Sequence, residues 1–169
     1  MTKLKNIKKL LIEIAQQIAQ NEDICKLIYN DSSSALEESY NGPLELDALI
    51  NEHYISFYPP VETGIKDNQR NTFMIILLDS IDLDREDNNT TGQINIYITT
   101  DVNHILLTKN RNRLIELADK IINTLEDTKF SVASTLMPVY CNHVMIDELR
   151  AGYRIGFNFA DQESVKAEI

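Results

Sequence analysis

The stretch that decides the fold is Thr72-Phe73-Met74-Ile75-Ile76-Leu77-Leu78, an apolar run that follows a polar segment. Consecutive side chains of an extended chain point to opposite faces, so this run predicts a strand with apolar side chains on both faces. Helices can cover one face of such a strand, and the other face needs a partner or a second layer.

Two further strands and one long helix follow from the same kind of pattern. Residues 93–100 and 150–159 alternate between apolar and polar or small side chains, which is typical of half-buried strands. A helix of about 15 residues, roughly 22 Å long, begins near Asn112. Its apolar stripe is expected to meet the last strand at Tyr153, Ile155, Phe157 and Phe159.

The remaining elements are shorter. Extended segments are expected over 55–58, 130–137 and 139–146, the last two separated by Pro138, and a brief helix over 44–51. The order predicts an α+β fold, an antiparallel sheet of about four strands with helices packed on one face.

The N-terminal part is expected to form a helical arm over residues 1–30, followed by a single α+β domain over 31–169. Apolar residues recur every three or four positions from Leu4 to Ile18, and Asn21 can cap a second short helix. Long loops are expected over 31–54, 61–70 and 80–92. The basic amphipathic helix could lie on a membrane, but packing on its own sheet or on a neighbouring subunit is the favoured interpretation.

Charge is unevenly distributed along the 169 residues, whose net charge is −10. Residues 1–20 hold four Lys against one Glu, whereas residues 21–91 hold fifteen acidic side chains against four basic ones. Specific nucleic-acid binding needs a dense basic surface and is therefore disfavoured. Two distant cysteines indicate a reducing, cytoplasmic setting, and no apolar run approaches the roughly 20 residues that span a bilayer.

Few residues suggest chemistry. The acidic run Asp79, Asp82, Asp84, Glu86 and Asp87 is the best metal candidate, but it lacks the glycine turn and terminal Glu of a calcium loop. A solvated hairpin tip explains it better, and a small metal-dependent hydrolase or nuclease using Asp79–Asp87 stays open as an alternative, as does a regulatory binding module.

Cys141 and His143 lie two residues apart on an expected strand, so they share a face. That pair suits zinc or a thiolate with its base, but no spacing supplies further ligands. A half-buried Cys beside a surface His is the favoured interpretation. No catalytic, cofactor-binding or metal-binding residue is assigned, and no cofactor is expected.

The order of elements over residues 55–161 resembles the neck and tail-completion proteins of tailed bacteriophages, especially tail terminators. The resemblance is carried by the strand end Phe57-Tyr58-Pro59-Pro60, the strand Phe73–Leu78, the hairpin partner Ile94–Ile98, the helix Arg113–Ile121 and the late strand Gly152–Asp161. It implies a non-enzymatic virion protein, assembled in the host cytoplasm. Such a protein forms a ring, often of six subunits, that caps the tail tube and joins it to the head–tail connector.

The partners implied are further copies of the chain, tail tube and sheath proteins, and connector proteins. DNA would pass through the bore without specific binding. Another neck component, such as a head-closure or tail-adaptor protein, is the alternative within the same class. The residues expected at the interfaces between subunits are Phe57, Tyr58, Met74, Ile76, Leu78, Arg150 and Arg154.

Overall fold

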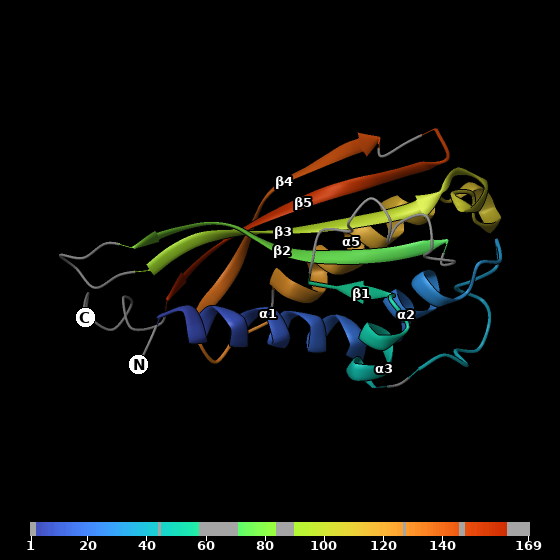
Figure 1. Ribbon diagram of the computed structural model, residues 1–169. Helices are drawn as coiled ribbons and strands as arrows, with labels where there is room; N and C mark the ends of the chain where they lie inside the picture. Colours follow the sequence, from blue (N-terminus) through green and yellow to red (C-terminus); the bar gives the residue numbers. More distant parts are fainter. Residues whose placement is uncertain are drawn as a thin grey trace.

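The computed structural model describes residues 3–43, 45–57, 71–83, 90–126, 128–145 and 148–161. It confirms the α+β class: one five-stranded sheet, in the order β1-β2-β3-β5-β4, carries helices on one face (Figure 1). The sheet has five strands where about four were expected. β1 pairs with β2 in the parallel sense, while all other neighbours are antiparallel.

The described elements run in the following order along the chain. They are α1 (Lys3–Gln20), α2 (Glu22–Tyr29), α3 (Leu46–Asn51), β1 (Ile55–Ser56), β2 (Thr72–Leu83), β3 (Thr90–Asp101), the 3₁₀ turns η1 (Val102–His104) and η2 (Thr108–Asn110), α5 (Arg113–Glu126), β4 (Ala133–Met145) and β5 (Arg150–Asp161).

The three central strands place one row of apolar side chains on the helix-facing side. Ile76 pairs with Ile96, and Ile96 pairs with Ile155 on its other side. All three are fully buried. This row repeats at every second residue, as the alternating sequence pattern predicted.

The strands of the hairpin β2–β3 extend into residues 80–92, where a loop was expected. β2 continues through Leu83 and β3 begins at Thr90, with a register shift between Leu78 and Ser80. Strand pairing through backbone hydrogen bonds tolerates the polar residues there, so side-chain polarity alone misplaced the ends of the strands.

Helices of the same chain cover the apolar row. Buried residues of α1, α2 and α5 form one cluster with the strand residues Met74, Ile76, Ile94, Ile96, Ile98, Ile155, Phe157 and Phe159. The expected contact between α5 and the last strand is thus present, with Tyr153 only partly buried. The N-terminal helices contribute Leu10, Ile14 and Leu27 to this cluster, so the segment 3–30 shares its core with the sheet.

β4 is a single strand of thirteen residues, not two segments separated by Pro138. It lies at the outer edge of the sheet, beside β5 (Figure 1). Proline cannot donate a hydrogen bond to a neighbouring strand, and the register shifts between Pro138 and Tyr140. The bulge absorbs the proline without ending the strand.

Candidate functional site

Arg113, at the start of α5, holds the helix layer to the loop that follows α2. Its side chain is fully buried. Its guanidinium donates hydrogen bonds to the backbone oxygens of Leu27, Asn30 (2.7 Å), Ser32 (2.6 Å) and His104 (2.8 Å). Burial lowers the pKa of Arg113, and the carbonyls of the C-terminal end of α2 partly compensate the buried charge.

The sequence contained a signal for this residue. Arg113 shares its helix face with Leu117 and Ile121, four and eight positions further on, both of which are fully buried. A basic side chain on an apolar stripe is expected to find acceptors in the interior. Its partners are backbone oxygens from two separate segments, residues 27–32 and His104. No sequence pattern identifies these partners.

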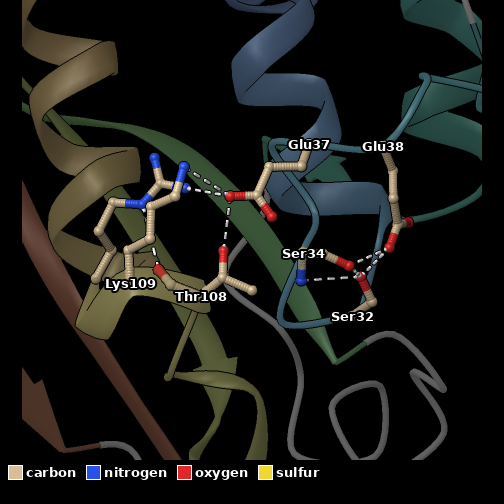
Figure 2. A network of polar contacts seen from close by, with 7 residues as sticks. Ser32, Ser34, Glu37, Glu38, Thr108 and Lys109 are labelled. Carbon is tan, nitrogen blue, oxygen red and sulfur yellow. Dashed lines mark hydrogen bonds and ion pairs between the residues drawn. The ribbon is translucent and has the colours of Figure 1, made fainter.

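A second polar network ties the loop after α2 to η2 (Figure 2). Glu37 accepts a hydrogen bond from Thr108 (2.9 Å) and forms ion pairs with Lys109 and Arg111, both at 3.4 Å. The hydrogen bond from Thr108 is the main cause of the lowered pKa of Glu37.

In the same loop, Glu38 accepts hydrogen bonds from Ser32 and from Ser34 (2.6 Å) (Figure 2). These two hydroxyls lower the pKa of Glu38. The three-serine segment that sequence composition marked as a loop is therefore held in a defined conformation by its own carboxylate.

The sheet face opposite the helices carries a stack of one cation and two aromatic rings. The guanidinium carbon of Arg154 lies 5.8 Å from the ring centroid of Tyr97 and 5.2 Å from that of Tyr140. An Nη atom of Arg154 also lies 3.4 Å from a carboxylate oxygen of Asp79. Arg154 is only partly exposed, and its Nε is buried without a hydrogen-bond acceptor.

Gly156 makes room for this stack. A Cβ atom at that position would lie 2.4 Å from the Tyr140 ring, closer than two atoms can pack. With the ring in place, the Tyr140 hydroxyl donates a hydrogen bond of 2.6 Å to Oδ1 of the buried Asn95. An aromatic side chain therefore covers a glycine of the neighbouring strand, as is common in sheets.

The edge strand β4 exposes several large apolar side chains. The exposed fractions are 59% for Met137, 48% for Val139 and 65% for Met145. β4 contains no Lys, Arg, Asp or Glu, although natural proteins usually protect long edge strands with charge. Its irregularities are register shifts between Ala133 and Leu136 and between Pro138 and Tyr140, whereas residues 140–145 pair with β5 without a further shift.

The structure separates the expected interface residues into three groups. Met74 and Ile76 have no exposed surface because helices of the same chain cover them. In this conformation neither side chain has surface left for contact with another subunit. Phe57 and Leu78 are partly buried against the core.

Arg150 and Arg154 are partly exposed on the face opposite the helices, where the guanidinium carbon of Arg150 lies 5.6 Å from the centroid of the Phe73 ring. Tyr58 lies outside the described residues. For Phe57, Leu78, Arg150 and Arg154, contact with another subunit remains a prediction.

The candidates for chemistry are only partly within the described chain. Asp79 and Asp82 lie in β2, whereas Asp84, Glu86 and Asp87 are outside the described residues. Among the residues that the structure describes, no three of His, Cys, Asp and Glu are grouped as metal ligands would be.

Cys141 and His143 are both exposed on β4. The His143 ring contacts Tyr153 edge-on, with centroids 5.6 Å apart. Partial burial raises the pKa of the Cys141 thiol, which is opposite to the shift that activates a nucleophile.

The described helices include none that is long and apolar enough to cross a membrane.

Comparison with known proteins assigns the chain to a family. The YomW family model matches residues 21–159, so the chain belongs to the YomW family. No curated protein matches it. Its fold is similar to that of a chain in the structure "Virion of native gene transfer agent (GTA) particle", with a TM-score of 0.56 at 10% sequence identity. The similarity covers 92% of this chain and 96% of that chain, and at this identity it is a likeness of fold.

Proposed function

We propose that this protein is a structural virion subunit of the phage tail, a tail terminator that forms a ring on the tail tube and joins it to the head–tail connector. The observation that carries the proposal is the β4 edge, a long uncharged strand with exposed Met137, Val139 and Met145. A strand of this kind is a template for pairing with another chain.

Two comparisons support the same class. The YomW family is associated with phages, and the matched fold belongs to a chain of an assembled virion particle. Because the fold likeness extends over nearly all of both chains, it concerns the whole subunit and not one shared motif.

Assembly into a ring suits the distribution of apolar surface. A rotation that closes on itself buries the same patch on every copy and leaves no free edge. The acidic excess of residues 21–91 suits a ring whose surfaces repel DNA, which can then pass without binding. In this proposal the ring has six subunits and lies in the tail or neck of the particle. Its partners are the tail tube, sheath and connector proteins.

The first test measures mass in solution. Light scattering on the purified protein should give a species near six times the subunit mass of 19.4 kDa. Val139→Lys and Met145→Lys should abolish it, because each places a charge on the β4 edge. Ile115→Lys is the matched control: Ile115 is also 54% exposed, but it lies on α5. A wild-type chain that stays monomeric at all concentrations would contradict the proposal.

The second test separates a terminator from another neck component. Purified rings should bind the ends of tail tubes polymerised from the tube protein of the same phage, and should stop their elongation. Rings that bind connector particles and leave tube growth unchanged would support a head-closure or adaptor protein instead.

A further inference from the structure

Helix α1 and the segments around its C-terminal end carry two oppositely charged surfaces. The first, the basic strip, is a shallow groove of about 520 Å³. Lys5, Lys8 and Lys9 line it together with Ile12, which is 37% exposed, and Glu13, which forms an ion pair with Lys9 at 3.7 Å. The described residues include no ion-pair partner for Lys5 or Lys8.

The second, the acidic cleft, is an open hollow of about 880 Å³ between the C-terminal part of α1, α2 and the loop leading to α3. Four glutamates line it, against one lysine. They are Glu22, Glu37, Glu38 and Glu45. All four are exposed, and within the described part of the chain Glu45 has no ion-pair partner.

The two hollows adjoin at Gln16, which lines both of them. From Lys5 to Gln16 the helix rises by roughly 16 Å. That is about twice the Debye length of about 8 Å at physiological ionic strength, so Lys5 is largely screened from the glutamates of its own cleft.

We propose that the basic strip of one subunit docks into the acidic cleft of a second copy of this chain. Charge complementarity identifies the occupant, because four glutamates line the cleft against one lysine, Lys26, and three lysines line the strip against one glutamate, Glu13. Glu22, Glu37 and Lys9 already have ion-pair partners in their own chain. The contact would therefore rest mainly on Glu45 in the cleft and on Lys5 and Lys8 in the strip. Ile12 adds apolar surface that such a contact would remove from water. The inference rests on the proposed ring, in which each subunit offers its strip to one neighbour and its cleft to the other.

Charge reversal gives a sharp test. K5E/K8E makes both surfaces of a subunit acidic, and E22K/E45K makes the cleft basic to match the strip. Neither variant alone should assemble, because every contact would join like charges. An equimolar mixture should assemble, since alternating copies then pair acidic with basic surfaces at every contact. An even-numbered ring such as a hexamer permits this alternation.

The control is D119K/E126K, which changes net charge as E22K/E45K does but on exposed positions of α5. Thermal unfolding should show that all variants fold. Light scattering on each variant and on the mixture gives the result. Assembly of K5E/K8E alone to the wild-type mass would overturn the contact while leaving the ring intact.

Other outcomes are equally distinct. Rescue by mixing that yields only dimers would support the contact and contradict the ring. Loss of DNA affinity in K5E/K8E with assembly unchanged would overturn the contact in favour of a nucleic-acid surface. Wild-type protein that never associates would overturn both the ring and the contact.

Discussion

The two faces of the sheet differ in what completes them. On one face, α1, α2 and α5 bury a continuous row of isoleucines and phenylalanines. On the other face, one arginine stacks between two tyrosines, and the outer strand β4 ends in exposed Met145. The helix-covered face is finished by its own chain, so it serves stability. In the proposed ring, the opposite face and the β4 edge are the surfaces available for contacts between chains.

The largest effect is expected from a substitution on the helix-covered side of the sheet. Arg113→Leu should lower the free energy of unfolding by about 3–5 kcal/mol, because it removes a buried cation and leaves carbonyl acceptors unsatisfied. Arg113→Lys keeps the charge but has fewer donors to share among four oxygens. Its free energy of unfolding should lie between those of the wild type and Arg113→Leu. Chemical denaturation of both variants measures this. A loss below about 1 kcal/mol for Arg113→Leu would mean that the buried network contributes little.

A smaller effect is expected at the uncovered face. Gly156→Ala should displace the Tyr140 ring, break its hydrogen bond to Asn95 and cost about 1–3 kcal/mol. The double variant G156A/Y140A removes the obstructing ring. Gly156→Ala should therefore cost less stability in the Y140A background than in the wild-type chain. If alanine at position 156 is neutral in the presence of Tyr140, the close packing described here is not required.

Arg154→Met tests the stack itself and should cost about 1 kcal/mol or less, because the cation–π contacts and the ion pair with Asp79 are partly exposed to solvent. The effect should shrink further at high salt, which screens the ion pair. Thermal unfolding of wild type and Arg154→Met at low and at high salt measures this loss of stability under both conditions. A salt-independent loss would indicate that packing of the side chain, and not its charge, matters.

The smallest effect is a pH dependence. The pKa values of Glu37 and Glu38 lie below their ordinary 4.5, so the folded chain binds these protons less tightly than the unfolded chain does. Their contribution to stability is complete above about pH 4.5 and is lost as the pH falls through the folded pKa values. The variant E37Q/E38Q should therefore show a shallower loss of stability than wild type on acidification. Equal slopes would refute the two networks of Figure 2.

Much of the fold was predictable from sequence because apolar alternation and helical spacing act locally. The row through Ile96 and Ile155 and the apolar stripe of α5 both follow from such patterns. The parallel pairing of β1 and the passage of β4 through Pro138 were not predictable, since both depend on which strands meet in space.

The candidate site was less accessible to sequence reasoning. An apolar residue such as Met74 looks the same in sequence whether helices of its own chain or a neighbouring subunit cover it, and in the structure helices of its own chain cover it. The exposure of β4 follows from its place at the end of the sheet order, which no local pattern states.

The β4 edge carries its own native probe, because exposed Cys141 lies in this strand. Buried Cys25, whose pKa burial raises to about 11, is an internal reference that should react slowly in every state. The most direct measurement is the alkylation rate of Cys141, followed by mass spectrometry in dilute and in assembled protein. The account predicts rapid modification in the dilute monomer and strong protection in the assembly. Equal rates in both states would show that the β4 edge remains open when subunits associate, and would contradict the account.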